Sequence, residues 1–185
     1  MLKLKSITKD YDKKRVLDDF SHTFDDYGIY AVIGESGKGK TTLLNIIAGL
    51  DKDFTGEIEK ENRKFSMVFQ EDRLLPGLNV IKNVMFVNKD KEKALNALEI
   101  VGLKGEENSR LSSLSGGMLR RVSIARALCA DYDVLLMDEP FSSIDKERKT
   151  SIMDVIKIIS KNHLVIFVTH DISEAEYLKA TVIRL

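Results

Sequence analysis

Residues 34–41 read Gly34-Glu35-Ser36-Gly37-Lys38-Gly39-Lys40-Thr41, the most informative stretch of the sequence. The pattern is that of a phosphate-binding loop: a glycine, four residues of any type, a second glycine, a lysine and a hydroxyl residue. Before it, the apolar run Ile29–Ile33 predicts a buried strand; after it, the spacing of Thr41–Ala48 predicts a helix that ends at Gly49. A strand, a glycine loop and a helix in this order bring backbone amides and the positive end of the helix dipole to a phosphate group.

Three residues of this loop have distinct predicted tasks. Gly39 lets the backbone approach the phosphates closely, because it carries no side chain. Lys40 would bridge the β- and γ-phosphate oxygens of a nucleotide as a fixed positive charge, and the Thr41 hydroxyl would bind Mg²⁺. An ordinary glycine-rich turn is the alternative, but a chance match to the whole pattern is a roughly one in a hundred event in a chain of this length. The predicted nucleotide-binding residues of the loop are Gly34, Glu35, Ser36, Gly37, Lys38, Gly39, Lys40, Thr41 and Thr42.

A pair of acidic residues follows a second apolar run. Val134–Met137 predicts a buried strand, and Asp138 and Glu139 come directly at its carboxyl end, where a parallel sheet presents ligand-binding groups. Asp138 would hold Mg²⁺ through water, and Glu139 would polarise the water that attacks the γ-phosphate. The alternative is an acidic loop after a core strand, and the phosphate loop elsewhere in the chain favours the catalytic interpretation.

A second glycine-bearing segment, Leu114-Ser115-Gly116-Gly117-Met118, precedes a stretch with an apolar face that predicts a helix through Ala130. Ser115 stands where a helix N-cap belongs. Two glycines at a helix start leave amides open to an anion, so Ser115, Gly116 and Gly117 predict a second phosphate-binding surface that has no lysine of its own. Taken alone, Ser-Gly-Gly is also an ordinary flexible turn.

The rest of the chain alternates short apolar runs with longer amphipathic segments, which predicts an α/β fold with a largely parallel sheet. Leu2–Ile7 and Val16–Phe24 read as antiparallel strands joined by a polar turn at residues 12–14. From Arg73 to about Leu114 the pattern becomes helical, and we interpret this stretch as an insertion. The other predicted elements are a strand at Phe65–Phe69, a helix at about Lys89–Val101 that stops at Gly102, a helix at about Asp145–Asn162, a strand at Leu164–Val168, a helix near Ser173–Leu178 and a strand at Thr181–Leu185.

Composition excludes several classes of protein. Lysine plus arginine and aspartate plus glutamate number 29 each, so the chain has no general electrostatic field for a polyanion, and we expect no nucleic acid partner. Cys129 is the single cysteine, which excludes an intramolecular disulfide and a cysteine metal cluster. No apolar run approaches the ~18 to 20 residues that span a bilayer, so we expect any membrane role to come through a partner.

The order of the motifs resembles that of the ATP-binding cassette (ABC) ATPases. Leu-Ser-Gly-Gly between a phosphate loop and a strand that ends in Asp-Glu is similar to the signature of this family. Gln70 matches its glutamine loop, residues 142–145 resemble the loop after the acidic pair, and residues 169–171, Thr-His-Asp, resemble its histidine switch. Tyr11 falls where the family places an aromatic ring against adenine. The resemblance covers essentially the whole chain.

The resemblance implies a P-loop NTPase of ABC ATPase type. One domain would span residues 1–185, with a mostly parallel sheet, an antiparallel N-terminal β part and a short helical subdomain at about residues 73–130 that includes the signature helix. Two cassettes would meet head to tail, so that ATP lies between the phosphate loop of one and the signature of the other. Gln70 would contact Mg²⁺ and the attacking water, His170 would hydrogen-bond the γ-phosphate, and Asp145 would lie at the dimer contact.

Residues 71–80 with Asn83-Val84 resemble the same region in cassettes of bacterial importers for nitrate, sulfonates and taurine. This implies an energy-coupling subunit on the cytoplasmic face of the cell membrane, partnered by transmembrane permease subunits and by a second, identical or different, cassette. Leu74, Leu75 and Leu78 would line the groove that receives the permease, unless they fill the core of the insertion. Met118 departs from the family pattern, which usually has glutamine there.

Two other functions stay open at this point. A soluble ABC ATPase of translation or DNA repair is disfavoured, because such relatives usually carry two cassettes, large insertions or basic extensions. A small-molecule kinase shares the phosphate loop but leaves Leu114–Gly117 and His170 without a purpose.

Overall fold

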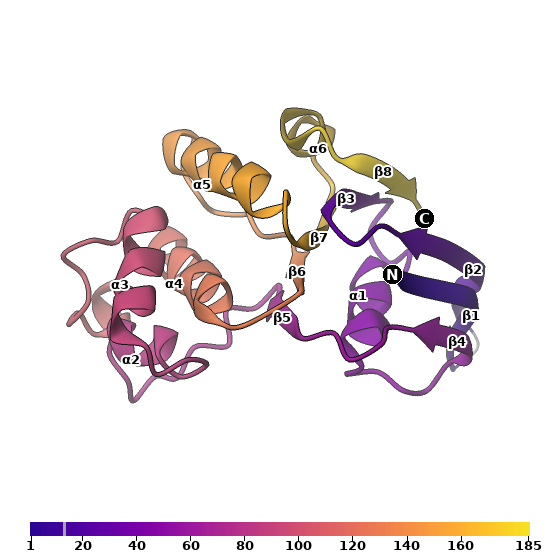
Figure 1. Cartoon of the computed structure of the whole chain (residues 1–185), viewed down its shortest axis with the longest axis horizontal. Coiled ribbons are helices and arrows are strands. Elements are labelled where there is room, and N and C mark those ends of the chain that lie inside the picture. The colour runs from indigo at the N-terminus through magenta and orange to yellow at the C-terminus, as the bar shows by residue number, and fades with distance from the viewer. Residues whose placement is uncertain (13) are drawn as a thin grey trace.

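A five-stranded parallel sheet forms the centre of the molecule (Figure 1). The structure is a computed structural model that describes residues 1–12 and 14–185, so the predicted turn at residues 12–14 lies partly outside the described residues. The strand order is β5-β6-β7-β3-β8, and all neighbours are parallel. The strands are β3 (Gly28–Ile33), β5 (Phe65–Val68), β6 (Val134–Asp138), β7 (Leu164–Thr169) and β8 (Thr181–Arg184).

Alternate side chains of these strands enter two different hydrophobic cores. In β7, Val165 and Phe167 pack with the helices of one face, whereas Leu164 and Ile166 pack with the other face. A strand covered on both faces needs apolar residues at every position, which is why β6 and β7 are continuous apolar runs. The predicted parallel sheet and its strands at these places are confirmed.

A second sheet is antiparallel and has the order β2-β1-β4, with strands β1 (Leu2–Tyr11), β2 (Lys14–Phe24) and β4 (Thr55–Glu59). The predicted pairing of the first two strands is confirmed. The third strand, β4, was not predicted from the sequence. Its residues are exposed except for the partly buried Ile58, so it carries no alternating apolar pattern and is recognised only by its pairing with β1.

The helices divide into three groups (Figure 1). Helix α1 (Lys40–Ala48) follows the phosphate loop and ends at Gly49 in the left-handed conformation, as predicted. Helices α5 (Lys146–Ile159) and α6 (Ile172–Leu178) lie on the face of the parallel sheet opposite to α1, where they pack in the core that contains Val165 and Phe167. Helices α2 (Val80–Val84), α3 (Lys91–Ile100) and α4 (Gly116–Cys129), with the 3₁₀ turn η1 (Leu111–Ser113), form a lobe at one side.

Helix α2 was not predicted, because five residues are too few to show a helical period. It depends on asparagine side chains instead. Asn79 caps its first turn by accepting a hydrogen bond from the Lys82 amide, and the buried Asn83 bonds the backbone of Leu75 and Leu78.

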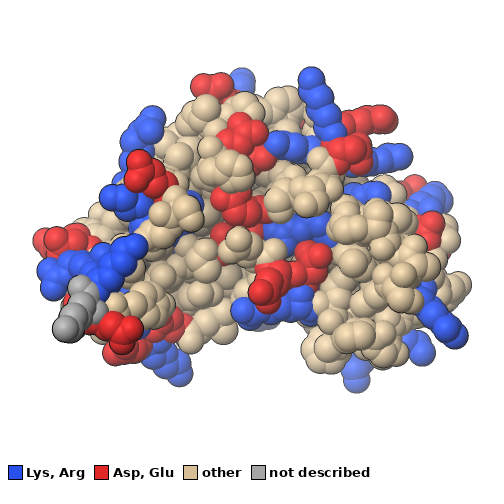
Figure 2. Space-filling model, turned by 180° about the vertical axis from the view of Figure 1, so that it is seen from behind, with Lys and Arg blue, Asp and Glu red and all other residues tan. Residues whose placement is uncertain are grey.

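The surface carries charges of both signs. Lysine and arginine are interspersed with aspartate and glutamate over the face seen in Figure 2. Among the helices of the described residues, none combines the length and the apolar character that a membrane span requires.

Candidate functional site

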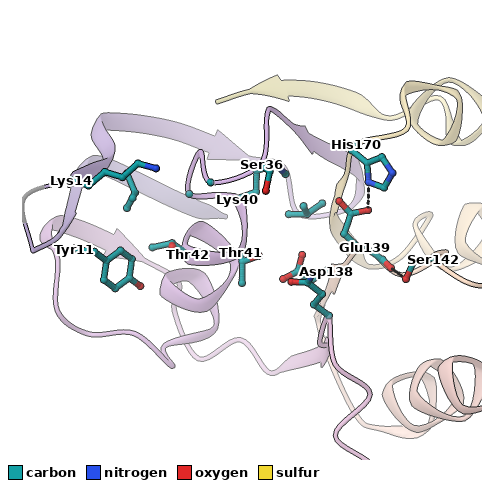
Figure 3. Close-up of a pocket in the computed structure, with 15 residues that line it drawn as sticks. Tyr11, Lys14, Ser36, Lys40, Thr41, Thr42, Asp138, Glu139, Ser142 and His170 are labelled. Atoms are coloured by element: carbon teal, nitrogen blue, oxygen red, sulfur yellow. Dashed lines mark hydrogen bonds and ion pairs between the residues drawn. The ribbon is translucent and has the colours of Figure 1, made fainter. Parts of the chain in front are cut away.

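A cavity of ≈ 650 Å³ opens at the carboxyl ends of β3, β6 and β7 (Figure 3). It collects side chains and backbone from the glycine loop, the acidic pair and three more distant segments. Gly34, Glu35 and Lys38 belong to the loop but do not line the cavity. The predicted site residues that line it are Tyr11, Ser36, Gly37, Gly39, Lys40, Thr41, Thr42, Gln70, Asp138, Glu139 and His170.

The glycine loop needs glycine for two separate reasons. Gly37 and Gly39 have φ angles of 79° and 82°, in the left-handed region that residues with a side chain rarely adopt. A Cβ atom on Gly39 would also lie 2.5 Å from the Val16 carbonyl oxygen of β2. The Lys40 ammonium donates to the Gly34 and Glu35 carbonyl oxygens, at 2.8 and 2.9 Å, and this fixes its side chain across the loop.

The first acid of the pair is buried. Asp138, the last residue of β6, is 1% exposed, and burial raises the pKa of its carboxyl group while the Thr41 hydroxyl opposes this rise. Its Oδ1 atom has no hydrogen-bond partner among residues 1–12 and 14–185. A buried carboxylate oxygen without a partner is costly unless a cation or an ordered water satisfies it.

The second acid, Glu139, has a backbone conformation that directs its side chain into the cavity. Glu139 follows β6 directly and has a φ angle of 47°, also in the left-handed region. Its Oε2 atom lies 2.9 Å from Nδ1 of His170, which comes from the end of β7 (Figure 3). This hydrogen bond, with the negative charge of Glu139, raises the pKa of the exposed His170. The structure thus gives His170 a partner on its own chain, where the sequence suggested only a phosphate.

Tyr11 is held in place at the far side of the cavity. Its hydroxyl donates to Asp51 at 3.1 Å, and the buried Lys9 ammonium lies 4.8 Å from the ring centroid. The ring stays 47% exposed, so one face is available to a flat ligand. Four lining residues are not among the predicted site residues: Lys14, Val16, Ser142 and Val168. Ser142 belongs to the loop that was expected after the acidic pair, whereas nothing in the sequence pattern separates the other three from their neighbours.

The second glycine-bearing helix start does not join this cavity. Ser115 caps α4 by accepting a hydrogen bond from the Met118 amide at 3.3 Å, as predicted. A Cβ atom on Gly117 would lie 2.6 Å from the Ser143 carbonyl oxygen, whereas one on Gly116 would meet no atom of the described residues within 4 Å. Within the part of the chain that the structure describes, Ser115, Gly116 and Gly117 are absent from the cavity lining.

A second hollow, of ≈ 640 Å³, lies between the end of α1, strand β5 and the segment after α2. Leu50, Phe86 and Val87 line it and are exposed. Leu74, Leu75 and Leu78 do not border this hollow, and their place in a permease groove stays a prediction. Leu74 packs against the core of the helical lobe instead.

Comparison with known proteins agrees with this arrangement. The sequence model of the family described as ABC transporter matches residues 17–142. An aliphatic sulfonates import ATP-binding protein SsuB of Bacillus cereus is 42% identical over 193 residues, which cover 97% of this chain and 77% of the relative. The SsuB protein of Bacillus subtilis is 39% identical over 191 residues, which cover 96% of this chain and 75% of the relative.

A solved structure has the same fold. It is the dimeric structure of a post-hydrolysis state of the ATP-binding cassette MJ0796 bound to ADP and Pi, which has a TM-score of 0.90 and 29% sequence identity. The match covers 100% of this chain and 94% of that chain. The family model matches more than half of the chain, and the relatives are similar over nearly all of it, so the chain belongs to the ABC transporter family.

Proposed function

We propose that this chain is the ATP-binding and ATP-hydrolysing subunit of an ABC importer, one cassette over residues 1–185 with a helical subdomain at about residues 73–130. The observation that carries the proposal is the cavity in which Lys40, Asp138 and Glu139 meet, although they come from distant parts of the sequence. Because the relatives are named aliphatic sulfonates import ATP-binding proteins, we take aliphatic sulfonates as the proposed substrate class.

The residues of the cavity fit a magnesium ion. The orphaned Oδ1 of Asp138 calls for a cation, and the Thr41 hydroxyl and the Gln70 amide oxygen add the oxygen ligands that Mg²⁺ prefers. When bound, the ion would neutralise charge on the β- and γ-phosphates. We therefore assign Thr41, Asp138 and Gln70 to the metal.

The remaining residues bind ATP and move one proton. Tyr11 stacks on the adenine, while the Gly34–Thr42 amides and the Lys40 ammonium hold the phosphates. The Glu139 carboxylate accepts a proton from the attacking water as general base. His170, bonded to Oε2 of Glu139, keeps that carboxylate turned into the cavity, and its other ring nitrogen would be free to hydrogen-bond the γ-phosphate.

A second cassette completes the site. The Ser115–Gly117 helix start offers amides to an anion but stands apart from the cavity of its own chain. We propose that it binds the γ-phosphate of ATP held by a partner cassette, in a head-to-tail dimer with Asp145 at the contact.

The permease would bind the second hollow. Leu50, Phe86 and Val87 expose apolar side chains there, and Phe69, which precedes Gln70, lines the same hollow. A permease segment in this groove would touch the glutamine loop directly. With such a partner, we propose that the chain lies on the cytoplasmic face of the cell membrane. The non-transport alternative loses its support, because both relatives are named as import proteins.

The test is the Glu139→Gln variant. Because this variant loses the general base and keeps the binding contacts, its rate of Mg-ATP hydrolysis should fall at least about 100-fold. Addition of Mg-ATP should also convert its monomer into a dimer, which size-exclusion chromatography with light scattering detects. Glu99→Gln, an exposed glutamate of α3, is the control and should hydrolyse ATP like the wild type. Wild-type turnover by Glu139→Gln would refute the role given to Glu139. A dimer that forms equally without ATP would refute the head-to-tail site.

A further inference from the structure

Arg120 is a buried arginine on α4 that the sequence analysis did not single out. Its side chain is 3% exposed, and it is the fifth residue of the helix that begins at Gly116. A buried guanidinium needs acceptors for its N–H groups and a compensating negative charge. The positions of those acceptors relate the helix to the catalytic cavity.

One set of acceptors is the backbone around the acidic pair. Nη2 of Arg120 donates to the Asp138 carbonyl oxygen at 2.6 Å and to the Glu139 carbonyl oxygen at 2.8 Å. Nε donates to the Pro140 carbonyl oxygen at 3.1 Å. Three consecutive carbonyl groups, from the last residue of β6 onward, therefore accept hydrogen bonds from a single side chain.

The other set of acceptors belongs to the glutamine loop. Nη1 of Arg120 donates to the carbonyl oxygens of Phe69 and Gln70, the latter at 3.3 Å. The same nitrogen lies 3.2 Å from Oδ1 of Asp72, which supplies the negative charge. Strands β5 and β6 are neighbours in the sheet, so one planar guanidinium ties together the two loops that leave them.

These contacts explain how the strained backbone of Glu139 is held. A residue with a side chain keeps a positive φ only where its surroundings fix it, and the φ angle of Glu139 is 47°. Arg120 binds the carbonyl of Glu139 and those of both sequence neighbours. A side chain of the signature helix α4 thus fixes the backbone conformation that turns the Glu139 carboxylate into the cavity.

We propose that Arg120 is a positioning residue, which holds the general base Glu139 and the metal ligand Gln70 in register and links both to the start of α4. The inference rests on the proposed function, because it concerns the same site. Ser115–Gly117 would contact the ATP of the partner cassette. If this helix start moved on that contact, Arg120, one turn further along α4, would transmit the movement to Glu139 of its own chain.

The neighbouring Arg121 provides a matched control. Its Nη1 donates to the carbonyl oxygens of Val101 and Gly102, at 2.9 and 2.8 Å, within the helical lobe. Arg121→Lys therefore loses the same kind of hydrogen bond, from a guanidinium to backbone carbonyl oxygens, in the same helix. It changes no contact with the glutamine loop or with the acidic pair.

The first experiment measures steady-state hydrolysis of Mg-ATP by Arg120→Lys and Arg121→Lys. A lysine keeps the charge but cannot reach both loops, so kcat of Arg120→Lys should fall on the order of tenfold while KM stays within about twofold. Arg121→Lys should keep both values within about twofold of the wild type. Equal kcat values for the two variants would overturn the proposal, as would a loss in KM alone.

The second experiment needs no activity. Exchange of the amide hydrogens of Glu139, Phe141 and Ser142 should become at least about tenfold faster in Arg120→Lys and stay unchanged in Arg121→Lys. Unchanged exchange in Arg120→Lys would also overturn the proposal. If that variant does not fold, Arg120→Gln, which retains one amide donor group, replaces it with the same expected results.

The two levels of inference fail separately. A wild-type protein that does not hydrolyse Mg-ATP refutes the proposed function whatever the variants do. An active wild type with equal Arg120→Lys and Arg121→Lys variants refutes only the positioning role.

Discussion

Two helix starts in this molecule carry glycines, those of α1 and α4, and each is pressed against a carbonyl oxygen of another segment. A Cβ atom on Gly39 would lie 2.5 Å from the Val16 oxygen, and one on Gly117 would lie 2.6 Å from the Ser143 oxygen. Both starts therefore depend on the absence of a side chain.

They differ in everything else. The α1 start has left-handed glycines, a lysine and, among the described residues, no side-chain cap, so its amides stay available and a positive charge is at hand. The α4 start has glycines with ordinary φ angles, and the Ser115 hydroxyl already occupies one of its amides. The comparison teaches that a glycine-rich helix start is a complete anion site only when backbone conformation, free amides and a cation coincide.

The largest effect is expected from Lys40→Ala, which leaves the start of α1 without a cation, like the start of α4. The dissociation constant for Mg-ATP should rise at least about 100-fold by calorimetry, because the phosphates lose their main counter-charge. Lys91→Ala is the control, since Lys91 is also the first residue of a helix, α3, and its loss should change the constant less than about threefold. Unchanged affinity in Lys40→Ala would show that the loop binds phosphate through its backbone alone.

The next effect separates the two glycines of the α4 start. Gly117→Ala should lower the free energy of unfolding by about 1 to 3 kcal/mol, because the new methyl group meets a backbone oxygen that cannot move away easily. Gly116→Ala should leave it unchanged or raise it by up to ~1 kcal/mol, because alanine favours a helix and the space is open. Urea denaturation checks both. Equal values for the two variants would contradict the close contact with Ser143.

A smaller effect concerns the cap. Ser115→Ala should lower the free energy of unfolding by ~1 kcal/mol in thermal denaturation, since the Met118 amide loses its acceptor. Ser115→Asp keeps an acceptor and should keep that stability, yet its negative charge should weaken Mg-ATP-dependent dimerisation in the Glu139→Gln background. A Ser115→Asp protein that dimerises normally would argue against a phosphate at the α4 start.

The smallest expected effect is a change in the pKa of His170. This residue lies in the cavity at the start of α1, and the start of α4 has no corresponding group. The Glu139 carboxylate raises the pKa of His170, so the charged contact is present below the ordinary value of 6.5 and is lost only as the pH rises through the higher value. In Glu139→Gln the pKa of His170 should be lower than in the wild type, as measured by NMR titration of the histidine side chains. The partly buried His22, whose pKa burial lowers, should titrate identically in both proteins. No change at His170 would mean that the contact is absent in solution.

Several parts of the molecule were predicted from patterns of neighbouring residues: a glycine-lysine motif, continuous apolar runs and a serine before a helix. The phosphate loop, the buried strands β6 and β7 and the cap at Ser115 belong to this group. Strand β4 and helix α2 were not predicted, because an exposed edge strand and a five-residue helix have no periodic signal.

The site was harder to predict than the fold. Asp138 and Glu139 were found by their position at a strand end and His170 by the family resemblance. The Glu139–His170 contact, however, depends on a positive φ that no sequence pattern displays. Arg120 and Arg121 are adjacent and identical in type, and only the rotation of ~100° per residue along α4 sends one to the catalytic loops and the other to the end of α3. Whether Leu74, Leu75 and Leu78 border a permease groove stays a prediction, since an apolar residue in a loop fills a core as readily as it borders a groove.

The order of the parallel sheet has a consequence for how the protein is made. Strand β3 carries the phosphate loop, yet its two neighbours are β7 and β8, and residues 34–163 lie between β3 and the first of them. A ribosome delivers β3 well before its two sheet partners, so the parallel pairing that holds the phosphate loop forms only after β7 has been synthesised. Forming the nucleotide site therefore requires the closure of a long loop at an entropic cost.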